Sequence, residues 1–514
     1  MKKGLLWTAG LLLTMGFSVH SQDNSMKLDF DGAEQVINKN IYGQFAEHLG
    51  RCIYDGIWVG PDSDIPNENG YRKDVLEALK ELQIPVLRWP GGCFADTYHW
   101  KDGVGPVSER PQIKNVFWGG TVENNSFGTH EFLNLCEMIG ADAYISANVG
   151  SGTVQEMVEW IEYMVSDDDV PMANWRRENG REAPWDVKFL GVGNESWGCG
   201  GDMTPEYYSD LLRQYSLYAR QYGQGKFQRV GCGANGFDVR WTDVVMKNAH
   251  RNMDALSVHY YTIATGDWGY KSPATGFDET LYIKGLSQGL RMDDLITQHA
   301  AAMDKYDPEK NIGLLVDEWG IWTEVEPGTE PGFLFQQNSM RDALIAATTF
   351  DIFHRHADRV QMANIAQVVN VLQAMILTEG DKMIKTPTYH VFKMYSGHQD
   401  ATYIPVSLSS EEYKVGDIAI PTVSGTASTK DGKVNVSLSN TNPHKAIKVI
   451  VDLGSGKVKK VNNGVVLTAP AFNAINTFDK ADVVAPAAFK NYKLSKNTLE
   501  VTLPAMAVVN LELQ

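Results

Sequence analysis

Short apolar runs of strand length recur eight times between residues 41 and 367, and longer segments of helical character separate them. Strands of a parallel sheet are buried on both faces, so they read as continuous apolar runs rather than alternating ones. Segment 204–222 shows helical apolar spacing and opens with Thr204 as an N-cap followed by Pro205, a usual start of an α-helix. The eight expected strands are 41–45, 86–89, 143–148, 187–194, 229–234, 256–261, 312–319 and 360–367.

Eightfold alternation of strand and helix predicts a closed (β/α)8 barrel of the TIM type, in the α/β class. The main rival is a doubly wound open sheet, which is built from the same alternation. Open sheets that bind nucleotides carry a GxGxxG or GxxxxGK[ST] loop after a strand, and neither motif follows any of the eight runs. We therefore expect the closed barrel over residues 41–395.

The pattern changes near Ser396, because stretch 395–514 contains no tryptophan and no cysteine. Its later runs alternate apolar and polar residues, at 433–439, 446–453, 498–503 and 507–513. Such alternation is typical of antiparallel strands with one solvent-facing side. We expect a C-terminal all-β sandwich over residues 396–514, and we expect segment 26–40, which precedes the first barrel strand, to join it as an extra strand.

The amino end has the three-part layout of a secretory signal. Lys2 and Lys3 precede the apolar run 4–17, and small and polar residues follow around 18–22. We expect residues 1–21 to be a signal peptide and the protein to be exported, as a periplasmic or secreted protein. The alternative is an uncleaved membrane anchor, but the run is short for a membrane span, and no other stretch approaches about 20 apolar residues.

Composition places the chain among ordinary globular proteins, with 514 residues of which 43% are hydrophobic and 21% charged. Acidic residues outnumber basic ones 63 to 46, which gives a net charge of −17. This balance argues against nucleic acid, anionic membrane surfaces and polyanionic substrates such as unmodified pectate. Neutral polysaccharides remain compatible with it.

The five cysteines are too few and too scattered for a disulfide framework, and at least one thiol must stay unpaired. No Cys/His spacing of a zinc site is present. His48 and His259 lack a clear third ligand, so we expect no metal. Hydrogen bonds from these histidines to Glu47, Glu318 or a sugar hydroxyl are the preferred interpretation.

Two glutamates, Glu195 and Glu318, follow or end the fourth and seventh expected strands. In a barrel of this type the carboxyl ends of the strands meet at one mouth, where side chains act together. A facing pair of carboxyl groups is the machinery for cleaving an acetal, with one proton donor and one nucleophile. At about 5–5.5 Å separation the pair would act with retention of configuration. A single glutamate at a strand end is more often a salt-bridge residue, but two on these strands favour catalysis.

The surroundings of the two glutamates predict different roles. Asn194 and Trp197 give Glu195 a partly apolar setting, which would raise its pKa and keep it protonated as the acid. Arg88 and Tyr261 would hold Glu318 ionised as the nucleophile.

Three other residues near the expected mouth leave alternatives open. Cys93 is either a small buried side chain or part of a sugar pocket. Trp319 and Trp322 are either core residues or stacking platforms for a sugar ring.

At these positions the chain resembles the α-L-arabinofuranosidases of glycoside hydrolase family 51, over roughly residues 26–514. The motifs that carry the resemblance are IYGQFAEHLGRCIYDGIW at 41–58, LRWPGGCFAD at 87–96, GVGNESWGCGG at 191–201, SVHYYT at 257–262, DEWGIW at 317–322 and NIAQVVNVLQ at 364–373. An Asn-Glu pair alone suits many barrel glycosidases, whereas the first two motifs together narrow the family sharply.

The resemblance implies a (β/α)8 barrel with a C-terminal jelly-roll sandwich, which releases terminal arabinofuranose with retention and without any cofactor. It implies Glu195 as acid/base and Glu318 as nucleophile. It further implies contacts to furanose hydroxyls from Glu47, Asn194 and Gln367, support of the nucleophile by Arg88 and Tyr261, and a sugar pocket lined by Cys93 and Trp322. Family members are often hexamers or other oligomers, so a homo-oligomer is expected.

The leading hypothesis is an exo-acting enzyme that trims arabinan, arabinoxylan or arabino-oligosaccharides. A second enzymatic hypothesis keeps the mechanism and changes the sugar, as an endo-β-glucanase or a xylosidase, because fold and chemistry are shared more readily than substrate. A third is a non-catalytic polysaccharide-binding protein that acts through its sandwich. The paired glutamates argue against it, as does the lack of tryptophan after Trp322.

Overall fold

The structure, a computed structural model, describes residues 24–222 and 225–514, and the expected signal peptide at 1–21 lies outside the described residues. Eight parallel strands close into a barrel in the order β10-β11-β12-β13-β2-β5-β8-β9. The predicted TIM-type barrel is therefore confirmed, and the open sheet is excluded. The barrel strands are β2 (Gly43–Phe45), β5 (Val86–Trp89), β8 (Asp142–Ala147), β9 (Val187–Val192), β10 (Gln228–Asn235), β11 (Ala255–Thr262), β12 (Gly313–Ile321) and β13 (Val360–Ala366).

Apolar side chains fill both faces of these strands. All nine residues of β12 are buried, as the continuous apolar runs require. Inside the barrel, seven strands each contribute one residue to a packed cluster, so the barrel interior is a core and not a channel. These residues are Val86, Tyr144, Phe189, Val230, Ala255, Leu315 and Met362.

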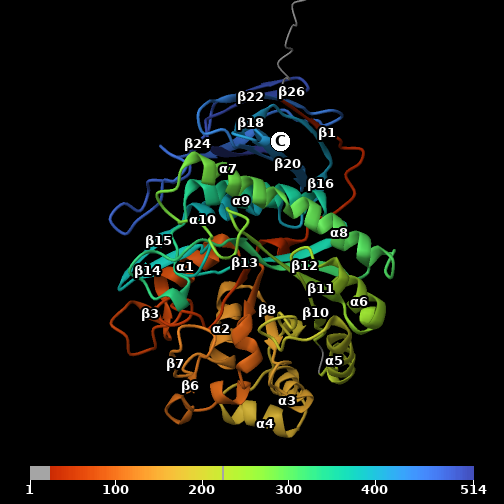
Figure 1. The fold of residues 1–514 in the computed structure, drawn as a ribbon, viewed down its shortest axis with the longest axis vertical. Coiled ribbons are helices and arrows are strands. Elements are labelled where there is room, and N and C mark those ends of the chain that lie inside the picture. Colours follow the sequence, from red (N-terminus) through yellow and green to blue (C-terminus); the bar gives the residue numbers. More distant parts are fainter. Residues whose placement is uncertain (1–23, 223–224) are drawn as a thin grey trace, which may run out of the picture.

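Helices surround the barrel (Figure 1). Helix α5 begins as its sequence predicts, because the Thr204 side chain accepts a hydrogen bond from the Tyr207 amide and Pro205 takes the first helical position. The helices are α1 (Lys73–Leu82), α2 (Thr129–Ile139), α3 (Val154–Val165), α4 (Pro171–Glu178), α5 (Pro205–Tyr218), α6 (Val239–Ala249), α7 (Glu279–Leu290), α8 (Met292–Asp304), α9 (Met340–Arg355) and α10 (Pro387–Tyr395). Within residues 24–222 and 225–514, no helix has both the length and the apolar character needed to span a membrane.

Two sheets pack into the C-terminal sandwich. Strand β1 lies between β17 and β22, antiparallel to the first and parallel to the second. The first sheet contains β17 (Val406–Ser409), β1 (Ser25–Leu28), β22 (Ile447–Asp452), β26 (Thr498–Leu503) and β25 (Tyr492–Ser495). The second contains β16 (Thr402–Ile404), β20 (Val423–Lys430), β21 (Lys433–Asn440), β27 (Ala507–Leu513), β23 (Val461–Leu467) and β24 (Ala487–Ala488). Strand β26 shows the predicted alternation, with every second residue buried.

Four short hairpins and several 3₁₀ turns complete the described part of the chain. The hairpins are β3 (Asn67–Glu68) with β4 (Tyr71–Arg72), β6 (Ile113–Lys114) with β7 (Val122–Glu123), β14 (Ile376–Glu379) with β15 (Lys382–Lys385), and β18 (Glu412–Val415) with β19 (Ile418–Pro421). The 3₁₀ turns are Lys39–Tyr42, Cys93–Thr97, Trp100–Gly103, Val107–Glu109, His250–Asn252, Pro331–Phe333 and Ser396–His398.

Helix α9 lies between the barrel and the sandwich (Figure 1). Fifteen of its sixteen residues are buried, because both of its sides are covered. Its Asp351 carboxylate accepts hydrogen bonds from the Tyr395 hydroxyl at 3.0 Å and from the Ser424 hydroxyl of the sandwich at 2.6 Å. Burial raises the pKa of Asp351 to about 7.

Two buried histidines join the same contact. His354 of α9 hydrogen bonds the Tyr42 hydroxyl at 2.7 Å and the Thr426 hydroxyl of β20 at 2.9 Å. His398 hydrogen bonds the hydroxyl groups of Ser428 and Ser437 at 2.7 and 2.9 Å. Burial lowers the pKa of His354 well below its usual value and that of His398 to about 3. This junction therefore holds both imidazoles in their neutral form.

Candidate active site

The carboxyl ends of six barrel strands, β2, β5, β9, β11, β12 and β13, bring together the side chains that the sequence places there. Pairing of β11 with β12 sets His259 beside Glu318, across an irregularity that follows Ser257. Gln367 comes directly after β13, and Glu195 lies in the turn after β9. Polar residues from distant parts of the chain thus share one mouth.

Glu318 is buried and held by two donors. The Arg88 guanidinium donates to Glu318 Oε1 at 2.9 Å, and the Tyr261 hydroxyl donates to Oε2 at 2.8 Å. Arg88 also lies over the Phe45 ring at 4.4 Å and donates to Asn194 Oδ1 at 2.5 Å. A guanidinium and a phenol that donate to the same carboxylate fix its orientation.

Close backbone packing gives the Glu318 carboxylate its place. A Cβ atom added at Gly92 would lie 2.9 Å from Glu318 Oε1. Gly92 therefore leaves room for the Glu318 carboxylate, and any larger side chain at this position would occupy that space.

Glu195 sits in a tight turn and contacts His259. The turn closes through hydrogen bonds from the Gly198 and Gly200 amides to the Glu195 carbonyl, at 2.7 and 3.0 Å. His259 Nδ1 lies 2.8 Å from Glu195 Oε1. Burial and the nearby Glu318 carboxylate raise the pKa of Glu195, although the His259 hydrogen bond works in the opposite direction. The raised pKa favours a protonated carboxyl group.

The two carboxyl groups face each other at short range. One oxygen of Glu195, one of Glu318 and a His259 nitrogen all lie within 4.8 Å of one another. The separation expected of a retaining glycosidase is about 5–5.5 Å between carboxyl groups, whereas inverting enzymes need roughly 6.5–9.5 Å. The observed arrangement fits the shorter class.

His259 connects three acidic side chains. Besides Glu195 it pairs through Nε2 with Asp317 Oδ1 at 3.0 Å, and its Nδ1 lies 3.5 Å from Glu318 Oε2. Burial alone would lower the pKa of His259, but the charges of Glu318 and Asp317 outweigh it and raise this pKa to about 10. The imidazole is therefore a cation at neutral pH.

Asp317 was not among the site residues that the sequence indicated. Burial alone would raise its pKa, but Arg88 and His259 lower it below the usual value. The Tyr144 hydroxyl also donates to Asp317 Oδ2 at 2.9 Å. Its place next to Glu318 in the DEWGIW motif is the only signal that could have found it.

Glu47 is a third buried carboxyl group, surrounded by donors. Its Oε1 accepts from the amides of Gly92 and Phe94 and from the Trp118 indole at 2.9–3.1 Å, and its Oε2 accepts from Gln367 at 2.8 Å. Burial and the negative charge of Glu318 raise the pKa of Glu47 to about 7. Trp118 lies between β6 and β7, far along the chain from the end of any barrel strand, and for that reason sequence reasoning missed it.

Several polar atoms of the mouth are buried without a hydrogen-bond partner in the described part of the chain. Among the residues that the structure describes, Asn194 Nδ2 and Gln367 Oε1 have no hydrogen bond. Unpaired buried polar atoms are costly unless they bind something. One donor and one acceptor in the mouth suit the hydroxyl groups of a sugar.

Cys93 forms a disulfide with Cys199, with an S–S distance of 2.07 Å. The two sulfurs lie 3.9 and 3.4 Å from Glu195 Oε2. Of the two interpretations of Cys93, the wall of the site fits its position better than a buried thiol. The two cysteines are 106 residues apart in the sequence, so no local spacing of cysteines predicts this disulfide. The described cysteines outside it, Cys52, Cys136 and Cys232, are free and buried.

The remaining aromatic and histidine candidates fall into two groups. Trp322 is partly exposed and packs edge-on against Tyr261, with ring centroids 4.9 Å apart. Trp319 is a core residue, stacked on Phe392. His48 does not contact Glu47 or Glu318 through its side chain in any described hydrogen bond or ion pair, and instead faces Glu123 at 3.6 Å.

The described residues contain two groups close enough to hold a metal ion, but their chemistry opposes it. In the first group, Cys93 and Cys199 are joined in the disulfide and therefore offer no thiolate to a metal ion. In the second, His259 stands between Glu195 and Glu318 as a cation and so offers no lone pair at neutral pH.

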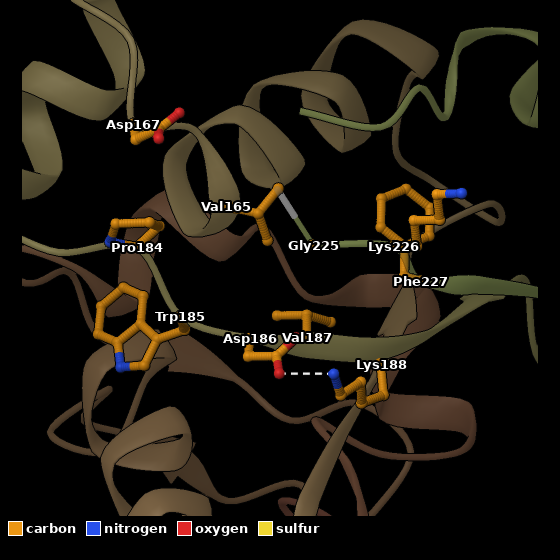
Figure 2. Close-up of a pocket in the computed structure, with 10 residues that line it drawn as sticks. All are labelled: Val165, Asp167, Pro184, Trp185, Asp186, Val187, Lys188, Gly225, Lys226 and Phe227. Atoms are coloured by element: carbon orange, nitrogen blue, oxygen red, sulfur yellow. Dashed lines mark ion pairs between the residues drawn. The ribbon is translucent and has the colours of Figure 1, made fainter. Parts of the chain in front are cut away.

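A pocket of about 560 Å³ lies at the amino ends of the barrel strands, away from the mouth. It is lined by residues at the start of β9 and by the segment just before β10 (Figure 2). Asp186 and Lys188 form an ion pair of 2.5 Å there, and Asp167 lies on the far side of the pocket in Figure 2. Active sites of this fold lie at the carboxyl ends of the strands. The geometry of Glu195 and Glu318 therefore defines the candidate site.

Comparisons with known proteins cover both parts of the chain. The family model for the α-L-arabinofuranosidase 1 domain matches residues 78–276, and the model for the α-L-arabinofuranosidase C-terminal domain matches residues 317–507. A relative from Bacteroides ovatus, an intracellular exo-α-L-arabinofuranosidase, is 53% identical over 514 residues, which is 100% of this chain and 99% of that protein. A probable α-L-arabinofuranosidase C from Aspergillus niger is 35% identical over 82% of this chain and 85% of its own length.

Solved structures agree with these matches. The family 51 arabinofuranosidase from Xanthomonas axonopodis pv. citri is 49% identical, with a TM-score of 0.94 over 96% of this chain and 100% of that one. The α-L-arabinofuranosidase from Thermotoga maritima, solved as an arabinose complex, is 30% identical, with a TM-score of 0.84 over 95% of this chain and 99% of that one.

The prediction of export is wrong. The Bacteroides ovatus relative matches over the whole chain, amino end included, and is described as intracellular. Two lysines before a short apolar run are a brief and weakly specific pattern. A full-length relative at 53% identity therefore outweighs it, and the signal peptide is not supported.

Both family models, the full-length relative and the fold comparisons name the same activity. The activity named by these relatives is hydrolysis of a glycosidic bond. The chain belongs to the α-L-arabinofuranosidases of glycoside hydrolase family 51, and it is a glycoside hydrolase.

Proposed function

We propose that this enzyme removes terminal non-reducing α-L-arabinofuranosyl residues by double displacement, with Glu195 as acid/base and Glu318 as nucleophile. The observation that carries the proposal is the placement of these carboxyl groups within 4.8 Å in unlike surroundings. Glu318 is bound by Arg88 and Tyr261, whereas burial raises the pKa of Glu195. Two unlike carboxyl groups at this separation suit retention.

In the first step, Glu318 attacks the anomeric carbon while Glu195 gives its proton to the departing oxygen. The bond to the leaving group breaks, and a covalent glycosyl ester forms on Glu318. In the second step, Glu195 takes a proton from water, which attacks the same carbon and frees Glu318. Tyr261 and Arg88 orient the nucleophile through both steps.

The sugar ring would lie between the two glutamates. Glu47, Asn194 and Gln367 would bind its hydroxyl groups, and the Cys93–Cys199 disulfide and Trp322 would form the walls. The unpaired Asn194 Nδ2 and Gln367 Oε1 support these contacts. No cofactor or metal takes part in this scheme.

We further propose arabinan, arabinoxylan and arabino-oligosaccharides as substrates, cut from the non-reducing end. The description of the Bacteroides ovatus relative as an exo-acting enzyme supports end-wise cleavage. The net charge of −17 suits neutral polysaccharides. Residues 41–395 would form the catalytic barrel and residues 396–514 the sandwich.

A homo-oligomer, such as a hexamer, belongs to the same proposal. Val116 and Val122 near the β6–β7 hairpin are 64% and 63% exposed, and exposed apolar residues that cluster mark contact surfaces. Light scattering on the purified protein measures the assembly, and a monomer would reject this part.

The acid role of Glu195 is tested by changing the leaving group. Glu195→Ala should lower kcat/KM by about 10²- to 10⁴-fold on arabino-oligosaccharides, whose leaving oxygen needs a proton. Activated aryl arabinofuranosides scarcely need that proton, so their bond cleavage should suffer much less. Equal losses on both substrates would reject the assignment.

Substrate choice is tested on a panel. We expect activity on 4-nitrophenyl α-L-arabinofuranoside and on branched arabino-oligosaccharides to exceed that on 4-nitrophenyl β-xyloside and on a β-glucan. Greater activity on the last two would favour the xylosidase or endo-β-glucanase hypothesis. Binding without turnover of any of the four would favour a non-catalytic polysaccharide-binding protein.

A further inference from the structure

The loop between β11 and α7 exposes two large aromatic side chains. Trp268 and Tyr270 are 52% and 55% exposed. Both lie in the loop that leaves the carboxyl end of β11, which carries His259 and Tyr261. Large aromatic rings at the rim of a sugar-binding mouth have an apolar face available for stacking.

Trp268 continues a row of aromatic rings that begins at the nucleophile. The Tyr261 hydroxyl binds Glu318, and the Tyr261 ring packs edge-on against Trp322, with centroids 4.9 Å apart. Trp322 in turn packs edge-on against Trp268, with centroids 5.5 Å apart. The row thus runs from the buried nucleophile outward to an exposed indole.

A pocket of about 270 Å³ lies beside this row. Its lining includes His259, Tyr261, Trp268, Asn235, Gln288 and Arg291. His259 hydrogen bonds Glu195, so the pocket adjoins the side of the site where the proton donor stands. The group that leaves in glycoside hydrolysis must lie next to that donor.

Polar side chains in the pocket suit a neutral sugar. The Arg291 guanidinium lies 4.5 Å over the Phe237 ring and donates to Gln288 Oε1 at 3.1 Å. The Gln288 amide nitrogen is not used in that contact and remains a donor. A few polar groups beside an aromatic face are the usual composition of a site for a small polar ligand.

The loop is held in position by the segment after β12. Lys271 donates from its amide to Glu324 Oε1 at 2.9 Å, and the Glu324 amide donates to the Ser272 carbonyl at 2.8 Å. The Lys271 ammonium group donates to the Trp268 carbonyl at 2.9 Å. Binding to a platform that is ordered beforehand loses less conformational entropy.

From this geometry we propose that Trp268, with the pocket of Asn235, Gln288 and Arg291, forms the subsite for the leaving sugar. Its ligand is the neutral pentose ring of the xylan or arabinan chain that carries the arabinofuranosyl group. The ring stacks on Trp268, and its hydroxyl groups bind Gln288 and Arg291. This inference rests on the proposed function, because it needs arabinofuranose between Glu195 and Glu318.

The test compares a substrate that has a sugar leaving group with one that lacks any leaving ring. Trp268→Ala should lower kcat/KM on an arabinofuranosyl-substituted xylo-oligosaccharide or on arabinotriose by about 10-fold. Its kcat/KM on α-L-arabinofuranosyl fluoride should stay within about twofold of the wild-type value. Trp268→Phe retains a ring and should recover most of the loss.

Two further variants keep the test decisive. Gln288→Ala, on the other side of the pocket, should reproduce the split between the two substrates without altering the loop. Tyr218→Ala removes a ring that is 52% exposed at the far end of α5 and should change neither value.

Equal losses on both substrates, or none on either, for both Trp268→Ala and Gln288→Ala would overturn the subsite. If the wild-type enzyme released no arabinose from the fluoride or the oligosaccharides, the proposed function itself would fail. The two failures can be told apart, because the subsite fails in an enzyme that still releases arabinose, whereas the proposed function fails only if no arabinose is released.

Discussion

The barrel mouth and the junction of barrel and sandwich both bury polar side chains. The mouth pairs cations with carboxyl groups, whereas the junction pairs histidines with hydroxyl groups. At the mouth, Arg88 and His259 are cations among the carboxyl groups of Asp317, Glu318 and Glu195. At the junction, His354 and His398 stay neutral and hydrogen bond hydroxyl groups. The mouth is a network of charged groups, whereas the two imidazoles of the junction are neutral.

The difference shows what each region needs. Catalysis requires carboxyl groups that differ in proton affinity at short range, which charges of both signs can arrange. A contact between two structural units requires satisfied hydrogen bonds and gains nothing from buried charge. Removing one partner should therefore change activity at the mouth and pH-dependent stability at the junction.

The largest effect is expected from the nucleophile. Glu318→Gln keeps the shape of the side chain but cannot form the glycosyl ester, so turnover of 4-nitrophenyl α-L-arabinofuranoside should fall on the order of 10⁴-fold. Glu326→Gln, in the segment that follows the same strand, is the control and should retain activity. Substantial residual turnover in the Glu318 variant would reject the nucleophile assignment.

Loss of the central cation should come next. His259→Asn removes the imidazolium between Glu195 and Asp317, and kcat/KM should fall about 100-fold. Because His259 lowers the pKa of Glu195, the variant should keep Glu195 protonated to higher pH. The alkaline limb of the kcat/KM profile should therefore move to higher pH.

His99→Asn, which removes a histidine paired with Glu156 away from the mouth, should leave the profile unchanged. An alkaline limb that stays in place or moves to lower pH in the His259 variant would contradict the network.

The disulfide should have a smaller effect. Cys199→Ala breaks the covalent link between the turn that carries Glu195 and the loop after β5 that carries Cys93. The Glu195 carboxyl group should then be misplaced, and kcat/KM should fall about 10-fold. Cys136→Ala, at a buried free thiol, is the matched control. Unchanged kinetics in the Cys199 variant would show that the bridge does not position Glu195.

The smallest effect on activity is expected at the junction. The pKa of His398 is about 3 in the folded protein, whereas an unfolded histidine takes its proton near pH 6.5. The unfolded state therefore binds the proton first as pH falls, and folding stability decreases below about pH 6.5. Between pH 6.5 and 5 the cost is about 2 kcal/mol.

Urea denaturation at pH 7.5 and 5 measures this loss. His398→Gln should lose about 2 kcal/mol less than the wild-type protein between the two pH values, with unchanged turnover at neutral pH. Ser428→Ala retains the histidine and should show the wild-type pH dependence. Asp351, whose pKa is raised to about 7, opposes the trend in all three proteins, because the folded state binds its proton first. Parallel pH dependences of wild type and His398→Gln would exclude a neutral buried imidazole.

Much of the barrel, and the position of Glu195 and Glu318 at its mouth, could be predicted from the sequence, because both depend on local pattern. Leu314, Leu315 and Val316 form a continuous apolar stretch of β12 that is buried on both faces, and Glu318 follows them in the same strand. The partners that complete the mouth could not be predicted. Cys199 pairs with Cys93 across 106 residues, and Trp118 reaches Glu47 across 71. Contacts of this range depend on how the strands close, which no local pattern encodes.

The division of the chain at residues 395 and 396 stays a prediction. So do the catalytic roles of Glu195 and Glu318 and the roles of the residues around them, which are Glu47, Arg88, Cys93, Asn194, Tyr261, Trp322 and Gln367. Export is the prediction that failed, since it depended on a short segment around Lys2 and Lys3. Local sequence pattern thus predicts secondary structure well where burial repeats along the chain. It predicts cellular location poorly where the prediction depends on one short segment.

The central claim is that Glu318 carries the sugar while Glu195 handles the proton. Incubation with a 2-deoxy-2-fluoro-arabinofuranosyl donor that has a good leaving group should slow release of the covalent intermediate, and peptide mapping by mass spectrometry then locates the adduct. The account predicts a single adduct on the peptide that contains Glu318. An adduct on Glu195 or Glu47, or release of the sugar with inverted configuration and no adduct, would contradict it.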